Sequence, residues 1–356
     1  MLETLVAAAM AFALLLFALA GGADFGGGMW TFLARGEKAE DEAHLIDRAI
    51  GPIWEANELW IVVALVILWS GFPIVFSAFG ISLFVPLILV LVGIMLRGAA
   101  FSFQEHAAFA PFRGAFMAFG RAYGAVSVVS PFFFGLAAGT IASGRLRFEV
   151  AGPGADRFAV GRPTGGYFSP WLGPFPIACG VLALVVCAFL AAVYLTVEAE
   201  GSPELREAYR RRGLVTGTTL GALGLAVLPV MALDASYLWQ EIWRLPSVLF
   251  MGVAVLALAA SLALLYVERF WWARTAAVAH VTMIFCAWAS AQYPYLLVPD
   301  ITIFEASSPR PVLVALLILS FFYAAVLGPS LALLFYIFKR HPSQAPDPSE
   351  VAKEGE

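Results

Sequence analysis

The stretch GPIWEANELW, residues 51–60, stands directly before the apolar run IVVALVILWSGFPIVF of residues 61–76. Such a run fits a helix that crosses the hydrocarbon core of a membrane, which takes about 20 apolar residues. Two carboxylates, Glu55 and Glu58, therefore lie where the chain enters the bilayer, with Asn57 between them. Because ionised side chains at membrane depth are costly, these residues are candidates for a functional site.

The composition is that of a membrane protein. Of the 356 residues, 61% are hydrophobic and 13% are charged, whereas soluble domains carry about 25% charged residues. The net charge of -4, without a basic stripe, gives no indication of nucleic-acid binding. Cys179, Cys187 and Cys286 all lie in apolar runs, and their spacing matches no zinc, disulfide or haem-attachment pattern. We interpret these cysteines as small buried hydrophobic residues.

The apolar runs predict an all-α polytopic membrane protein of about nine transmembrane helices, because runs this long do not fit β-barrel strands. The first run carries Glu3 and lacks the basic region of a signal peptide, so we expect it to be retained as a span. We expect residues 1–340 to form one transmembrane helical domain and residues 341–356 to form a disordered cytoplasmic tail. The predicted spans are about 4–24, 52–76, 78–97, 115–140, 171–196, 213–233, 246–267, 273–296 and 312–338.

The distribution of lysine and arginine predicts the orientation of the chain. If the N-terminus lies outside, only six of the 21 basic residues fall on the outer side. These six are Arg145, Arg147, Arg157, Arg162, Arg244 and Arg310. The bias therefore predicts an outer N-terminus and a cytoplasmic C-terminus.

Four ionisable residues of the first three spans are expected at one membrane level. Asp24 lies about 20 residues, or roughly 30 Å, along the first span, which places it at the cytoplasmic end. Glu55 and Glu58 begin the second span, and Arg97 ends the third. Glu55 and Glu58 are three residues apart, so they face roughly the same way on a helix.

This cluster has two interpretations. The residues could be interfacial charges that reach water at the ends of the spans. Alternatively, they could form a cytoplasmic proton inlet, because a carboxylate partly removed from water can exchange a proton near neutral pH. Arg97 could oppose this by stabilising the charged form, and Asn57 with ordered water could carry the proton onward.

The glycines around Asp24, in GGADFGGGMW (residues 21–30), also have two interpretations. They could let neighbouring helices approach closely, which we favour. Alternatively, they could loosen the helix so that a polar head group or a quinone can approach.

Histidine is scarce in the predicted spans. Of the four histidines, only His280 lies inside a span. Haem held by two histidines would need a second one at matching depth, although methionine or an acid could serve as an axial ligand. We therefore expect no multi-haem redox centre in this chain alone, and we interpret His280 as a packed, hydrogen-bonded residue rather than a ligand.

Several motifs together resemble a known family. GGADFGGGMW, GPIWEANELW, and WSGFPIVFSAFG (residues 69–80) leading to LRGAAFSF (residues 96–103) resemble the first three spans of subunit II of cytochrome bd-type quinol oxidases. QYPYLLVPDITIFEASSP, residues 292–309, resembles that family's connection between its last two spans. The middle of the chain resembles the family only in hydropathy and in the order of its spans.

The resemblance implies a fold of two helix bundles plus a peripheral helix. It also implies a haem-free subunit of a bacterial inner-membrane oxidase, which oxidises quinol, reduces dioxygen to water and takes protons from the cytoplasm. A haem-bearing subunit I would be the partner and would carry haem b and haem d. Quinol, lipid and small single-span subunits would be further partners, and a structural quinone could bind to this chain.

Some site residues are implied by the resemblance alone. Glu55 falls where the family has an acid at the mouth of its proton path, and Trp54, Asn57 and Trp60 match the same motif. Trp54 and Trp60 would be the residues to contact a quinone. Asp24 matches the second acid of a signature in the first span.

Other positions differ from the family or are less informative. Gly21 stands where the family has the first acid of that signature, and Glu58 stands at a variable position. Arg97 matches an arginine at the end of the third span and is expected to form an ion pair. Glu305 falls at an acidic position on the outer side, where we expect a structural role.

Two other functions remain open from the sequence. The chain could be a proton-coupled transporter or channel, although such proteins place polar residues near the bilayer midplane, and here the charges gather at one face. It could also be a pure scaffold whose acids are merely interfacial.

Overall fold

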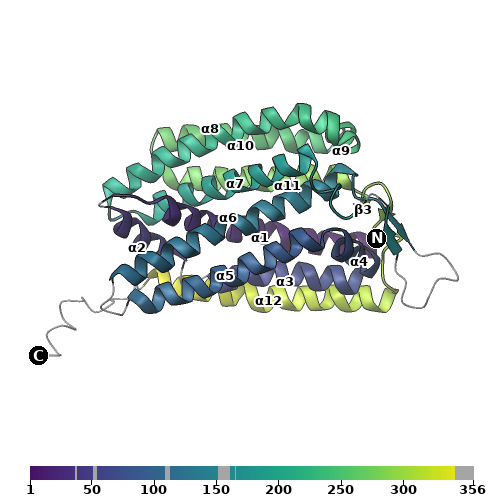
Figure 1. Ribbon diagram of the computed structural model, residues 1–356, viewed down its shortest axis with the longest axis horizontal. Helices are drawn as coiled ribbons and strands as arrows, with labels where there is room; N and C mark the ends of the chain where they lie inside the picture. The colour runs from purple at the N-terminus through teal and green to yellow at the C-terminus, as the bar shows by residue number, and fades with distance from the viewer. Residues whose placement is uncertain (37, 51–53, 109–112, 151–160, 165, 341–356) are drawn as a thin grey trace, which may run out of the picture.

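The computed structural model describes residues 1–340 except 37, 51–53, 109–112, 151–160 and 165. Long helices lie side by side along one axis, and short strands lie at one end (Figure 1). The helices are α1 (Leu2–Leu33), α2 (Ala39–Ile50), α3 (Trp54–Gly71), α4 (Pro73–Ser82), α5 (Phe84–Ala108), α6 (Arg113–Ser143), α7 (Pro174–Glu198), α8 (Pro203–Asp234), α9 (Ser236–Ile242), α10 (Ser247–Tyr266), α11 (Phe270–Gln292) and α12 (Arg310–Arg340).

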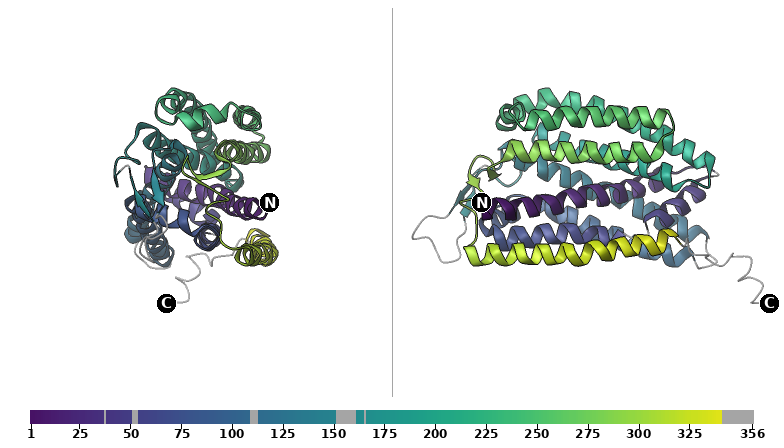
Figure 2. Two further views of the ribbon diagram at one scale, coloured as in Figure 1. Left: turned by 90° about the vertical axis from the view of Figure 1, so that its right-hand side faces the viewer. Right: turned by 180° about the vertical axis from the view of Figure 1, so that it is seen from behind.

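Two antiparallel hairpins mark one end of the molecule, which we call the hairpin end. Strand β1 (Phe148–Val150) pairs with β2 (Gly161–Pro163), and β3 (Tyr295–Leu297) pairs with β4 (Ile301–Thr302). The N-terminus lies at this end, whereas α2 lies at the opposite end, which we call the α2 end (Figures 1 and 2). The apolar runs of the sequence predict only helices, so these short hairpins are additional features.

All nine predicted spans correspond to long helices. Among the described residues, eight helices are long and apolar enough to cross a membrane, namely α1, α3, α5, α6, α7, α8, α10 and α12. The remaining span corresponds to α11, which has 23 residues and is not among these eight. We count α11 with the spans because it packs along α10 and α7.

The helices form the predicted two bundles and a peripheral helix. The first bundle contains α1, α3, α5 and α6, and the second contains α7, α8, α10 and α11. Helix α1 joins the bundles because it packs against both α6 and α7. Helix α12 packs against α1 and α3 at the edge of the first bundle (Figure 2).

The predicted span 52–76 ends earlier than expected. Phe72 leaves the helical conformation, with φ -137° and ψ 59°, and Pro73 begins the short helix α4. A residue that precedes proline is disfavoured in the α conformation, which explains the break. The next span therefore begins at Phe84 rather than at residue 78.

Helix α2 was not predicted, because it is polar along one face and too short to span a membrane. Its Glu42 is buried and accepts two hydrogen bonds of 2.9 Å from the guanidinium of Arg212 on α8. That guanidinium also lies 5.0 Å from the ring of Trp30. The ion pair attaches α2 to α8, and α2 also packs against α1, α6 and α7, so it contacts both bundles at the α2 end.

The glycines around Asp24 serve close packing of helices. A Cβ atom on Gly26 would lie 1.9 Å from the carbonyl oxygen of Cys187 on α7. A Cβ atom on Gly28 would lie 2.1 Å from the Oγ of Ser127 on α6. Helix α1 is continuous through the motif, so the glycines do not loosen it. The predicted tail, residues 341–356, lies outside the described residues.

We expect Gly26→Ala to lower the stability of the protein, because the added methyl group forces α1 and α7 apart. Overpacking of this kind costs about 1–3 kcal/mol. Gly224→Ala is the matched control, because no described atom lies within 4 Å of a Cβ atom there. In a helix the control change stabilises by up to about 1 kcal/mol. Thermal unfolding of the purified variants measures both effects, and equal stability of the Gly26 variant and the wild type would contradict the packing role.

Candidate functional site

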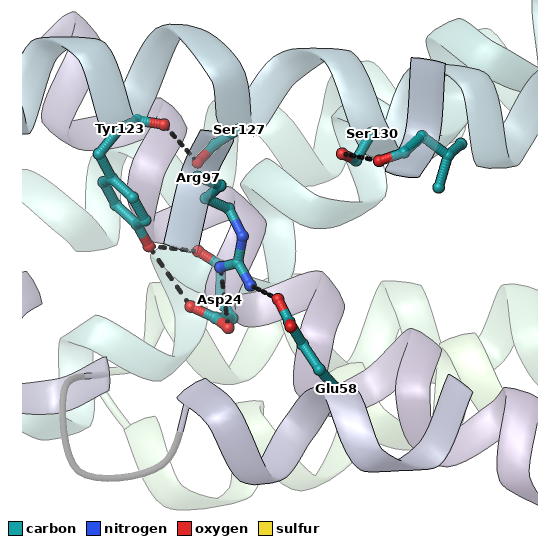
Figure 3. A network of polar contacts seen from close by, with 7 residues as sticks. Asp24, Glu58, Arg97, Tyr123, Ser127 and Ser130 are labelled. Atoms are coloured by element: carbon teal, nitrogen blue, oxygen red, sulfur yellow. Dashed lines mark hydrogen bonds and ion pairs between the residues drawn. The ribbon is translucent and has the colours of Figure 1, made fainter. Parts of the chain in front are cut away.

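Arg97 is the centre of a buried ion cluster formed by the first three long helices of the chain (Figure 3). From α5, its Nη1 atom lies 3.0 Å from Oδ2 of Asp24 on α1. Its Nη2 atom donates a hydrogen bond of 2.6 Å to Oε1 of Glu58 on α3. The side chains of Arg97 and Asp24 are each 1% exposed, and that of Glu58 is 24% exposed.

Aromatic rings surround the guanidinium of Arg97. Its central carbon lies 4.4 Å from the ring centre of Phe25, 5.9 Å from that of Trp54 and 6.0 Å from that of Tyr123. A cation that has lost its water is attracted to the faces of such rings. The rings therefore exclude solvent from the cluster while favouring the positive charge.

Helix α6 adds a tyrosine that the sequence analysis did not single out. The hydroxyl of Tyr123 lies 3.3 Å from the carbonyl oxygen of Asp24 and 3.4 Å from its Oδ1, and it donates to both. Ser127 in turn donates a hydrogen bond of 2.7 Å to the carbonyl oxygen of Tyr123 (Figure 3). A search for polar residues in the predicted span 115–140 would have found both, whereas a search restricted to charged residues does not.

The remaining residues of the GPIWEANELW motif occupy different environments. Asn57 is buried and lies beside Asp24. Glu55 is exposed near the start of α3 and, among the described residues, forms no ion pair with Arg97. The structure thus joins Asp24, Glu58 and Arg97 by direct contacts, while Glu55 lies one helical turn before Glu58, near enough for their charges to interact.

Asp24 also borders a cavity of about 240 Å³ between the two bundles. Alanine and leucine side chains of α1 and α7 form much of its wall, together with Trp60 of α3. Its polar side chains are Asp24, Asn57, Tyr194, Glu198 and Arg274. Trp54 is not part of this wall; its ring packs against Phe101, with 5.4 Å between the ring centres.

Three other candidate residues pack or form hydrogen bonds within the fold. His280 is buried, and its Nδ1–H donates a hydrogen bond of 2.8 Å to the carbonyl oxygen of Ala254 on α10. At the hairpin end, Glu305 accepts hydrogen bonds from the backbone N–H and the hydroxyl of Thr302, and the backbone bond lowers the pKa of Glu305 most. A Cβ atom on Gly21 would lie 3.1 Å from the ring of Phe17.

In the part of the chain that the structure describes, no three side chains of histidine, cysteine, aspartate or glutamate gather as a metal site. Cys179, Cys187 and Cys286 are free thiols, of which Cys187 is buried.

The ion cluster has more acid than base. When every group is ionised, Asp24 and Glu58 carry two negative charges against the single positive charge of Arg97. An uncompensated charge in a water-poor site is costly, and a bound proton removes it. The arrangement can therefore hold one proton and release it again.

Comparison with known proteins supplies a family. The family model described as "Cytochrome bd terminal oxidase subunit II" matches residues 2–338. Cytochrome bd-I ubiquinol oxidase subunit 2 of Escherichia coli (strain K12) is 29% identical over 191 residues, 53% of this chain and 47% of that protein. Cytochrome bd ubiquinol oxidase subunit 2 of Bacillus subtilis (strain 168) is 36% identical over 84 residues, 23% of this chain and 24% of that protein.

A solved structure agrees with the fold. A chain in the structure of bd oxidase from Geobacillus thermodenitrificans matches 95% of this chain and 98% of its own length, with a TM-score of 0.70 and 11% identity. The aligned region spans about half the length of the Escherichia coli relative. Since the family model extends over almost the whole sequence, the chain belongs to the cytochrome bd terminal oxidase subunit II family.

Proposed function

We propose that the chain is a haem-free accessory subunit of a cytochrome bd-type quinol:oxygen oxidoreductase. In this role it stabilises a haem-bearing subunit I and contributes to proton uptake from the cytoplasm. Membership of the family supports the assignment to an oxidase. The single observation that supports the proton role is the buried cluster in which Arg97 faces two carboxylates.

The proposed orientation places the α2 end in the cytoplasm of a bacterial inner membrane. Arg48, Arg121, Arg206, Arg211 and Arg269 are at or near this end, and an excess of basic residues favours the cytoplasmic side. The ion cluster lies nearer this end, because Asp24 is nine residues before the end of α1, or about 14 Å along the helix.

The proposed proton path begins at Glu55, the exposed acid of α3. Glu58 follows one helical turn later and is partly buried. Asp24, which is almost fully buried, holds the proton furthest from solvent, with Asn57 and Tyr123 beside its carboxylate. Burial increases from Glu55 through Glu58 to Asp24, which supports proton entry from the membrane surface to the carboxylates around Arg97.

A quinone could bind in the cavity, but only one of the two tryptophans could contact it there. Trp60 lines the cavity together with Asp24 and Asn57, which could hydrogen-bond a polar head group, and the apolar wall suits a hydrocarbon tail. Trp54 instead lies over the guanidinium of Arg97. When bound, a quinone would supply redox chemistry, while these side chains would bind and orient it.

The assignment to an oxidase predicts a haem-bearing partner. A tagged form of the chain, purified in mild detergent, is expected to bring down a larger membrane protein whose haems absorb visible light. The experiment measures the visible spectrum and subunit composition of the purified material. Repeated recovery of the chain without any haem would contradict the assignment.

Removal of the cation is expected to harm assembly more than turnover. Arg97→Ala leaves Asp24 buried beside Glu58 without a cation, and breaking a buried pair in this way costs about 3–5 kcal/mol. The yield and thermal unfolding of the complex measure this loss. Arg121→Ala, which removes an exposed arginine from α6, is the control. We expect Arg97→Gln combined with Asp24→Asn to recover part of the stability, and an Arg97→Ala complex as stable as the wild type would contradict the pairing.

Loss of the surface acid is expected to slow proton uptake. Glu55→Ala should lower quinol-driven oxygen consumption without loss of assembly, whereas Glu55→Asp should keep most of the activity because the acid remains. Asp41→Asn removes an exposed acid of α2 and serves as the control. Oxygen consumption and proton uptake by the purified complex are the measurements. Normal values for Glu55→Ala would remove Glu55 from the path.

A further inference from the structure

The geometry of the ion cluster raises a difficulty for a path that uses only α3. The guanidinium of Arg97 lies between the carboxylates of Glu58 and Asp24. Arginine remains protonated in proteins, so it cannot accept a proton from one carboxylate and pass it to the other. A proton that reaches Asp24 therefore needs a way around the guanidinium.

The cavity between the bundles provides such a way. Asp24 lies in its wall, and Glu198 and Arg274 lie in the same wall. Glu198 is the last residue of α7, and Arg274 is in the first turns of α11, so both are at the α2 end. Without a quinone in it, the cavity of about 240 Å³ has room for several water molecules.

One face of α7 connects the two ends of this route. Ala191, Leu195 and Glu198 all line the cavity, and their spacing of four and three residues places them on one side of the helix. From Ala191 to Glu198 the helix rises about 10 Å. Ala191 packs beside Gly26, close to Asp24 on α1. The cavity therefore follows the contact between α1 and α7 from the end of α7 toward Asp24.

Glu198 meets both solvent and the cavity. Its side chain is 23% exposed, and that of Arg274 is 25% exposed. Nη1 of Arg274 lies 3.5 Å from Oε1 of Glu198, and the guanidinium lies 4.4 Å from the ring centre of Tyr194. A partly exposed pair at this distance adds little stability. Arg274 nevertheless holds the Glu198 carboxylate at the mouth of the cavity.

We propose that Glu198 is the outermost proton-carrying group of a hydrated inlet that leads to Asp24 through the cavity. Glu198 takes a proton from bulk water and donates it to cavity water, which donates a proton to the Asp24 carboxylate; bulk water then reprotonates Glu198. Arg274 positions Glu198, and Tyr194 lies under that guanidinium. On the other side, Arg97, Glu58 and Tyr123 face Asp24. The inference rests on the proposed role in proton uptake, and it gives Asp24 a route separate from Glu55.

The test compares Glu198→Gln with Glu200→Gln in the purified oxidase complex reconstituted in vesicles. Glu200 is exposed two residues further on, so its change alters the net charge equally without touching the cavity wall. We expect a severalfold slower proton uptake for Glu198→Gln and an unchanged rate for Glu200→Gln. Glu198→Asp should recover most of the rate. Formate, a small acid that can enter the cavity, should also restore uptake in Glu198→Gln, which a purely structural role would not allow.

A second variant tests the cavity without removing an acid. Ala23→Leu places three further carbon atoms in the wall beside Asp24 and should slow uptake, and formate should not restore it. Ala8→Leu, at an exposed position of the same helix, is the control. This variant also decides the matter if Glu198→Gln fails to assemble.

The outcomes separate the inference from the proposed function. Normal uptake in Glu198→Gln and Ala23→Leu, with slow uptake in Asp24→Asn, would overturn the cavity route and leave the proton role intact. Normal uptake in all three variants and in Glu55→Ala would overturn both. Slow uptake in Glu198→Gln that neither Glu198→Asp nor formate restores would assign Glu198 a structural role and overturn the inlet.

Discussion

A guanidinium that has lost its water constrains the packing of the first bundle. Arg97 is 1% exposed, and burying a cation is tolerable only where anions and polarisable rings replace its water. Asp24 from α1, Glu58 from α3 and the rings of Phe25, Trp54 and Tyr123 supply those contacts. The three long helices must therefore keep a fixed depth relative to one another, because a shift of one turn, about 5.4 Å, would separate the charges.

Glycine makes this geometry reachable. The motif that contains Asp24 places Gly26 against the backbone of α7 and Gly28 against Ser127 of α6, where any larger side chain would collide. Gly98 on α5 follows Arg97 directly and lies under the ring of Trp54. A Cβ atom on Gly98 would lie 3.2 Å from that ring. Close approach of backbones brings the carboxylate, the guanidinium and the aromatic rings into contact. The same motif thus supplies the acid and the space that the acid needs.

The sequence predicted the long helices and the central ion pair, because both follow from quantities that it contains. Counting residues along apolar runs gives depth, and depth placed Asp24 and Arg97 at one level. The break at Phe72 was not predicted, because the apolar run continues on both sides of Pro73 and by itself predicts one span. Glu55 and Glu58 were expected in similar surroundings, yet only Glu58 reaches Arg97, since three residues of a helix turn a side chain by about 300° and move it deeper. The places of Tyr123 and Glu198 in the site depend on which helices pack side by side. The positions of the spans and the depths of their residues do not specify this packing.

Arg97 divides the acids of the site into two groups by their access to water. Glu58 is 24% exposed on one side of the guanidinium, and Asp24 is 1% exposed on the other. Since the guanidinium cannot relay a proton, we propose that the two carboxylates exchange protons with solvent by different routes. They nevertheless share one cation, so protonation of one strengthens the hold of Arg97 on the other. A site built in this way couples the two routes electrostatically while keeping them chemically separate.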